Sequence, residues 1–442
     1  MGIFKNQDGL EFTASSEDSV ALFEDLVTAN FGLREDVGKV LKSVVTTDPE
    51  MIMGQCASGY FSKMFGSLPM AGRAAKTSEK LGELITQHGA TDREKQHAGA
   101  LAKWCDGQID AATAEWENIL LDHPLDGLAL RLAHYTHFYS GDGRRMRDSI
   151  ARVLPAWDKS HRNYGYVLGC YAFGLEESRE YAKAELAGRE AVNLNAEDAW
   201  SVHSIAHVLE MQERHDEGVD WINGLEKGWS TAGNFRYHLH WHKCLFLLEQ
   251  GKTDEILEIY DTQVVKDIDV GFYLDVCNCA SLLRRLELHG VDVGDRWQGL
   301  LEESKNHLGN MELIFGTLHY LIVITANGDT ASQTTILNAL RACADEHTTP
   351  GRVSNRAGLA IAEAISEAGR GEYAPAARRM MDVRYHLDDI GGSMAQRDLF
   401  ELIMQDAAIR GGEGDLARAL LTDRIARKPN ARWANDQLAA LA

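Results

Sequence analysis

Residues that break helices or cross-link a chain are scarce in this sequence. Only 7 of the 442 residues are proline, so few helices are forced to end. The 7 cysteines are scattered and form no C-x-x-C pair, so no disulfide framework is expected. We therefore expect a helical protein with reduced cysteines, as is typical of the cytoplasm.

Long apolar runs and an excess of positive charge are also missing. No window approaches 18 uninterrupted apolar residues, and the N-terminus MGIFKNQDGLEF has no basic region followed by an apolar run, so neither a membrane helix nor a signal peptide is predicted. Lys and Arg total 45 against 66 Asp and Glu, a formal charge of -21 that would repel nucleic-acid backbones and anionic lipids. We expect a soluble, cytoplasmic protein with neither nucleic acid nor membrane as a partner.

Several common catalytic signatures are absent too. The sequence contains no G-x-x-x-x-G-K-[ST] phosphate-binding loop, no G-x-G-x-x-G after a strand, no H-E-x-x-H and no G-x-S-x-G. These absences disfavour nucleotide kinases, simple dehydrogenases, the common zinc proteases and α/β-hydrolases.

What the sequence does contain is a helix–turn–helix pattern that recurs roughly every 33 to 40 residues, the range of tetratricopeptide and related repeats. In the clearest copy, Ala102 to Pro124, the second helix carries Ala112 and Trp116 on one face. A second copy spans Leu168 to Trp200. Turns of weaker copies are expected near Glu213 to Asp216, Gly251-Lys252, Gly328-Asp329, Gly371-Glu372 and Gly412 to Gly414.

This recurrence predicts an all-α fold, a right-handed α-α superhelix of the tetratricopeptide-like solenoid type. Residues 93–442 are expected to form the repeat array. Residues 1–92 read as helices without a clean repeat, beginning at the cap-like cluster Ser15-Ser16-Glu17-Asp18, and are expected to cap the array as part of the same solenoid.

Histidines provide the most specific functional signal. His203 and His207 are separated by four residues, as are His238 and His242, on the expected first helices of adjacent repeats. Residues at i and i+4 share one face of a helix, and Glu210 extends the first face. In the register of the repeat, His203, His207, Glu210 and His238 face the concave groove, while His242 lies on the flank toward the preceding first helix.

Three interpretations of this histidine-rich stripe are open. His203 and His207, with one or both of His238 and His242, could hold a divalent metal such as Zn, Fe or Mn, with Glu210 as a ligand or base. They could instead act as acid and base, or bind a ligand, without a metal. The stripe could also be a polar groove wall of hydrogen-bonded histidines. His319, in FGTLHYL, occupies a comparable flank position further along the chain and is a further catalytic candidate.

Other side chains are candidates for binding a substrate. Some are aromatic or acidic residues on the groove stripe, and others follow the GGS turn. There, Ser393 and Gln396 have the spacing of a capping box. Arg397 is not needed for such a cap, and an arginine in an acidic protein could bind a carboxylate or a phosphate. The expected substrate-binding set is Tyr166, Glu176, Trp241, Ser393, Gln396 and Arg397.

Five segments resemble the tetratricopeptide repeat protein 38 family: YGYVLGCYAFGLEE, DAWSVHSIAHVLEMQ, HLHWHKCLFLLEQGK, ASLLRRLELHGVDVGDRW and GGSMAQRD. The resemblance covers roughly Gly127 to Arg427. It implies a helical-repeat fold. It also implies that the positions of the candidate histidines, of Glu210 and of the GGS-x-AQRD run are recurring polar positions in that family.

The sequence favours a small-molecule enzyme or binder. If it is catalytic, hydrolysis, elimination or isomerisation is expected, with histidine as base, Glu210 as its partner and Arg397 as an anion clamp. The alternative is a non-catalytic scaffold for a peptide or partner helix, although His and Glu concentrated in two repeats favour a compact site. Homo-oligomer formation through Trp433 and the apolar LAALA end is compatible with either function.

Overall fold

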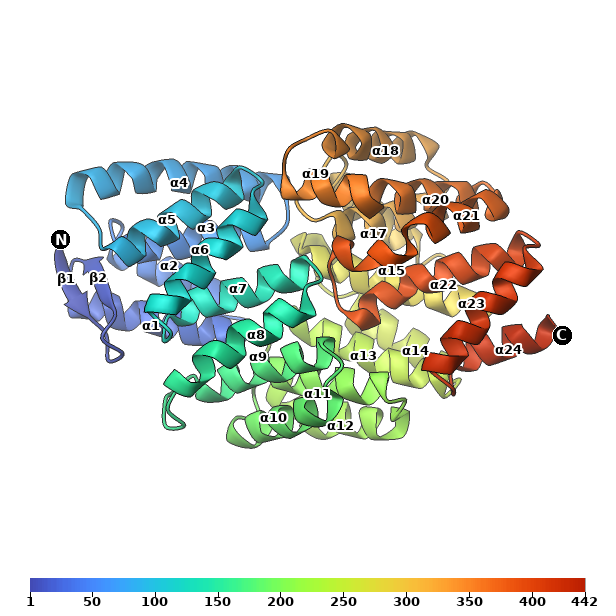
Figure 1. Cartoon of the computed structure of the whole chain (residues 1–442), viewed down its shortest axis with the longest axis horizontal. Helices are drawn as coiled ribbons and strands as arrows, with labels where there is room; N and C mark the ends of the chain where they lie inside the picture. The colour runs from blue at the N-terminus through green and yellow to red at the C-terminus, as the bar shows by residue number, and fades with distance from the viewer. Residues whose placement is uncertain (442) are drawn as a thin grey trace. The chain divides into compact units, whose positions relative to one another are not determined.

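The computed structural model describes residues 1–441, and almost all of its regular structure is α-helix (Figure 1). The chain divides into two compact units. Unit 1 contains Met1–Ile205 and Leu225–Arg236, and unit 2 contains Ala206–Gly224 and Tyr237–Ala442. The expected all-α fold is confirmed, whereas the expected division into residues 1–92 and 93–442 stays a prediction.

Unit 1 begins with a short hairpin and continues with ten helices. Its elements are β1 (Gly2–Lys5), β2 (Glu11–Ala14), α1 (Glu17–Phe31), α2 (Val37–Thr47), α3 (Ile52–Met64), α4 (Leu68–His88), α5 (Asp92–Cys105), α6 (Ile109–Asp122), α7 (Gly127–Tyr139), α8 (Gly143–Val153), α9 (Tyr164–Glu177) and α10 (Tyr181–Leu194). From α5 to α10 each helix packs on the next one in sequence, as helix pairs of a repeat do.

Three helices each contribute residues to both units: α11 (Ala199–Met211), α12 (His215–Trp229) and α13 (Phe235–Glu249). The rest of unit 2 consists of α14 (Thr253–Ile259), α15 (Tyr273–Leu288), α16 (Leu301–Asn306), α17 (Ile314–Ala326), α18 (Thr330–Ala344), α19 (Thr349–Val353), α20 (Leu359–Gly369), α21 (Tyr373–Val383), α22 (Met394–Arg410), α23 (Gly414–Arg427) and α24 (Arg432–Ala440). First helices of successive pairs lie against each other, α15 on α17 and α17 on α20.

The turns predicted near Glu213, Gly251, Gly328, Gly371 and Gly412 all exist, and they share one backbone feature with the turns at Gly107, Gly141 and Arg179. Each contains a residue with positive φ, a conformation that glycine adopts without steric cost. Two of these positions are occupied by non-glycine residues, Arg179 at φ 64° and Glu213 at φ 56°. The glycine positions are Gly107, Gly141, Gly251, Gly328, Gly371 and Gly412.

Small and aromatic residues hold the predicted pairs together. Trp116 of α6 is fully buried and lies edge-on to Trp104 of α5, with ring centroids 5.4 Å apart. On α10, a Cβ added to Gly188 would lie 3.4 Å from the Cβ of Ala172 on α9, and 2.6 Å from the Cδ1 of Ile205 on α11. Both copies recognised in the sequence are therefore real helix pairs whose spacing depends on those residues.

The N-terminus differs from the purely helical cap that we expected. Residues 2–14 form an antiparallel hairpin in which Phe4 pairs with Phe12. The side-chain oxygen of Asn6 accepts the backbone N–H groups of Asp8 and Leu10, and Gly9 has φ 79°. These are turn-forming residues, and they fix the hairpin before the first helix starts. The predicted start of α1 is correct, because Ser16 caps it by accepting the N–H of Ser19.

The C-terminal end also differs from expectation. Trp433 is buried in unit 2 among Leu402, Leu421 and Ala434, and its indole N–H donates to the carbonyl of Leu288 at 2.8 Å. It is therefore not available to contact a second copy of the chain, and that part of the oligomer prediction is wrong. Of the LAALA end, Ala442 lies outside the described residues.

Within residues 1–441 there is no helix that combines the length and the apolar character required to traverse a lipid bilayer.

Candidate functional site

Two helices of unit 2 carry the residues at the centre of the candidate site. The second half of α11 contributes His207 and Glu210, and α13 contributes His238 and His242. The i, i+3 and i, i+4 spacings place the members of each pair on one helix face. Glu210 is 8% exposed and none of the three histidines exceeds 3%. They are interior groups and not residues of an open groove wall.

The structure brings the three imidazoles together. The ring centroids of His207 and His242 are 4.5 Å apart, and those of His238 and His242 are 4.8 Å apart. Each ring offers a nitrogen, and these nitrogens all lie within 4.8 Å of one another. We call His207, His238 and His242 the histidine cluster.

Two neighbours orient the rings of the cluster. His238 Nδ1 lies 2.7 Å from the amide oxygen of Asn278 on α15, so its N–H donates there and its lone pair is on Nε2. His242 Nδ1 lies 3.3 Å from a carboxylate oxygen of Glu210. A carboxylate or amide that holds one ring nitrogen directs the other toward a ligand, as at many metal sites. The second carboxylate oxygen of Glu210 is 4.0 Å from the ammonium of Lys428.

The cluster is electrically neutral at physiological pH. Burial lowers the pKa of His238 to about 3, and the neighbouring His242 lowers it further. Burial likewise lowers the pKa of His242 to about 3, with a contribution from the Arg285 cation. The pKa of His207 lies well below its usual value, again chiefly because of burial. Neutral imidazoles can serve as metal ligands or as proton acceptors.

Three predicted site residues lie in unit 1. His203 is one helical turn before His207 on the same helix, on the unit 1 side of the boundary, and its ring packs against Trp200 at 5.1 Å and Phe235 at 5.0 Å. Tyr166 and Glu176 both belong to α9. Ten residues separate them, which corresponds to about 15 Å along a helix, so they do not belong to one compact site.

The remaining predicted residues of unit 2 have different surroundings. Trp241 stacks on His238, with ring centroids 5.0 Å apart and an interplanar angle of 12°. His319 donates its Nδ1–H to the carbonyl of Phe315 at 2.8 Å, and burial lowers its pKa to about 4. Trp241 therefore belongs with the histidine cluster, whereas His319 is held by its own helix.

At the start of α22, Ser393 and Gln396 form the predicted capping box. Arg397 lies with its Nε 3.0 Å from a carboxylate oxygen of Asp388, and it also donates to the carbonyl of Gly392. All three side chains thus stabilise the helix start. As an anion clamp, Arg397 would have to exchange the carboxylate that it already binds.

Residues that we did not predict complete the site. Asn278 and Arg285 come from α15, and Lys428 follows α23. One signal was present in ASLLRRLELHG: adjacent arginines at positions 284 and 285 cannot both face solvent on one helix, because neighbouring residues point to different sides. No local pattern indicates Lys428, because it is distant from Glu210 in the sequence and lies near it only in the folded chain.

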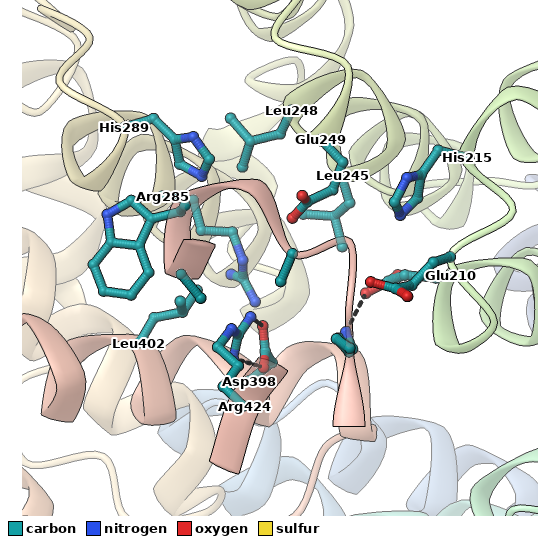
Figure 2. A pocket seen from close by; sticks show the side chains of 15 residues that line it. Glu210, His215, Leu245, Leu248, Glu249, Arg285, His289, Asp398, Leu402 and Arg424 are labelled. Carbon is teal, nitrogen blue, oxygen red and sulfur yellow. Dashed lines mark hydrogen bonds and ion pairs between the residues drawn. The ribbon is translucent and has the colours of Figure 1, made fainter. Parts of the chain in front are cut away.

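A cavity of about 40 Å³ lies next to the cluster within unit 2, and Glu210 lines it (Figure 2). Figure 2 shows the paired Asp398 and Arg424, with the guanidinium of Arg285 nearby. Two hydrogen bonds of 2.6 and 2.9 Å join Asp398 to Arg424. Glu210 thus connects the histidines to a charged cavity.

Comparisons with known proteins identify no family for the chain. No protein-family model matches it. The chain is 24% identical over 151 residues to the DNA replication and repair protein RecF of Pasteurella multocida (strain Pm70), a match that covers 29% of this chain and 39% of RecF. The chain therefore matches well under two thirds of that relative's length. A solved structure of Naa15/Naa10 bound to HypK-THB aligns with 91% of this chain and 68% of its own chain, at 10% identity and a TM-score of 0.26.

Proposed function

We propose that this helical-repeat protein holds a divalent transition metal, Zn, Fe or Mn, at the histidine cluster and uses it on a small molecule. The observation that carries the proposal is the meeting of three buried, neutral imidazoles from α11 and α13. Neutral imidazole is a preferred ligand of these metals, and three protein ligands with one open position are typical of catalytic zinc.

The geometry supports such a site after a small adjustment. Zn–N bonds of about 2.0–2.1 Å in tetrahedral geometry place ligand nitrogens roughly 3.4 Å apart. The cluster nitrogens lie within 4.8 Å of one another, so side-chain rotations that shift each nitrogen by about 1 Å would bring them to that spacing. His203, on the same face of α11 as His207, stays a predicted fourth ligand.

Glu210 has a role of its own in this proposal. Because its carboxylate lies 3.3 Å from Nδ1 of His242, it is placed to accept the N–H of that ring and to raise the basicity of the other nitrogen. It also lines the cavity, where a small molecule would meet it. A carboxylate in that position can accept a proton during metal-assisted hydrolysis, elimination or isomerisation. Membership of the tetratricopeptide repeat protein 38 family is part of the same proposal.

The second candidate function is a non-catalytic scaffold in which the histidines are structural. The nearly complete burial of the cluster favours it, because a substrate would have to enter through the cavity at Glu210. In that case Glu210 would be the fourth ligand and would close the coordination sphere, as in structural metal sites. A role on DNA is not part of either proposal, since the formal charge is -21.

Metal analysis of the untagged, full-length chain tests the metal site. After incubation with Zn, Fe or Mn and gel filtration, wild type should retain about one ion per chain. The double variant His207→Gln, His242→Gln should retain less than a tenth of that amount. His319→Gln is the matched control, because it removes a buried histidine outside the cluster. Equal metal content in all three proteins would refute the site.

A chelator then separates the two functions. If the metal is catalytic, its removal should abolish turnover in hydrolase and lyase substrate screens while the helical circular-dichroism signal stays unchanged, and Glu210→Gln should lose turnover yet keep the metal. If removal of the metal instead unfolds the chain, the metal is structural, as the second candidate function requires.

A further inference from the structure

The cavity beside the histidine cluster contains a buried cation that has no ion pair at contact distance. Arg285 is 3% exposed and lines the cavity. Its guanidinium donates to the carbonyl of Ala395 at 2.9 Å and to the hydroxyl of Ser281, both neutral acceptors. Within residues 1–441 no carboxylate oxygen lies within 4 Å of it. A buried, uncompensated charge is costly, so such a group calls for an anion.

The acidic side chains around the cavity act on Arg285 only from beyond ion-pair distance, because each has its own partner in contact. Asp398 is bound by both terminal nitrogens of Arg424. Glu213 accepts the backbone and side-chain N–H groups of Asn430, and Glu249 accepts the backbone N–H of Arg432 at 2.9 Å. Glu210 is engaged by His242 and Lys428, as described above. Arg285 is therefore the one cation of the lining that lacks an ionic partner.

The dimensions and charges of the cavity restrict what could bind. A volume of about 40 Å³ holds two or three water molecules or one small organic anion. Four carboxylates and three cationic side chains line it, so a single added negative charge is better tolerated than two. A carboxylate also matches the planar, forked donors of a guanidinium.

We propose that Arg285 binds the carboxylate of a small monocarboxylic acid in this cavity. This inference goes beyond the metal site and does not depend on it. Burial lowers the pKa of Arg285, which is consistent with a cation that is only partly compensated. In this proposal Arg285 has the anion-binding role that the sequence suggested for Arg397.

Thermal unfolding and calorimetric titration of the metal-free full chain test the proposal. Acetate is the probe, with inorganic phosphate and chloride compared at the same ionic strength. Acetate should raise the melting temperature of wild type, and Arg285→Met should weaken acetate binding at least about tenfold. An apolar replacement of a buried charge is usually compatible with folding. The matched control is Arg284→Met, on the same helix, which removes a partly exposed arginine paired with Glu287 and Asp406.

A second variant keeps Arg285 and fills the cavity beside it. Ala434 is buried in the cavity wall, and Ala434→Val should abolish acetate binding while leaving the guanidinium in place. The proposal is overturned if wild type binds no acetate, if phosphate or chloride binds as tightly as acetate, or if Arg285→Met and Arg284→Met bind acetate equally well. Metal retention by the Arg285 variant is measured separately. If this variant fails to bind acetate but still retains the metal, the loss concerns the cavity and not the histidine cluster.

Discussion

At the scale of single residues, the buried arginines differ in whether a carboxylate lies in contact with the guanidinium. In unit 1, Arg93 is buried in an ion pair with Asp126 at 2.6 Å. Arg131, also fully buried in unit 1, has no ion pair within the described part of the chain. It donates to the sulfur of Cys170 and lies over the rings of Tyr135 and Trp200, at 4.3 and 4.6 Å. Ring faces attract a cation, but they replace its hydration only in part.

This difference predicts different effects of the same substitution. Arg131→Met should leave the free energy of unfolding roughly unchanged, because the cost of burying this cation is offset only by ring faces, a sulfur and the more distant Asp198. Arg93→Met should lower it by about 3 kcal/mol, because the buried carboxylate of Asp126 would lose its arginine partner and keep only His97 beside it. Urea unfolding followed by circular dichroism measures both. A larger loss for Arg131→Met than for Arg93→Met would contradict the argument.

The sequence predicted the histidines of the site but not the groups that organise them. The i, i+4 spacings are local, so they could be read before the fold was known. Asn278 and Lys428 are distant in sequence and approach the histidines only because α15 and the end of α23 pack there. The partner of Arg397 was not predicted for the same reason, since Asp388 lies in the preceding turn and no periodicity connects the two.

At the scale of helices and turns, the repeat pattern was predicted well because its determinants are local. Glycines marked most turns, and Trp116 marked a packed helix pair. The hairpin of residues 2–14 was missed, although its N-x-D-G turn was a visible signal. Arg179 and Glu213 show the limit of reading turns from glycine alone, because both adopt positive φ without being glycine.

Arg179 therefore offers a test at this scale. It is exposed, has φ 64°, and ends α9 through the hydrogen bond from its N–H to the carbonyl of Glu176. Arg179→Gly should raise the free energy of unfolding by roughly 0.5–1 kcal/mol, since relief of the left-handed conformation exceeds the added chain entropy. Ala187→Gly, in the middle of α10, is the control and should lower it by about 1 kcal/mol. Equal effects of the two glycines would refute the strain argument.

At the scale of the whole molecule, buried histidines should make stability depend on pH. His238, His242 and His319 have pKa values of about 3, 3 and 4 in the folded chain, against about 6.5 when unfolded. Between the folded and the unfolded pKa values, the unfolded chain binds more protons than the folded chain. The contribution of these neutral histidines to the free energy of unfolding is therefore complete above about pH 6.5 and is lost as the pH falls.

Each such histidine can contribute at most about 1.4 kcal/mol per pH unit in that window. Unfolding free energies of metal-free wild type, measured between pH 7 and pH 4.5, should therefore fall steeply. His319→Phe should reduce the slope near pH 5 by up to that amount, because it removes one of the buried rings whose pKa is lowered by burial. An unchanged slope in the His319 variant would show that this ring is already charged in the folded state.

The stacking of Trp241 on His238 has a practical consequence. An indole in van der Waals contact with an imidazole changes its fluorescence when that ring gains a proton or a metal, and a paramagnetic ion such as Co²⁺ or Cu²⁺ at this distance quenches the emission outright. The chain contains nine tryptophans, so the difference between wild type and Trp241→Phe isolates the signal of this one. The protein thus carries its own optical reporter, placed against the histidines whose occupancy matters most.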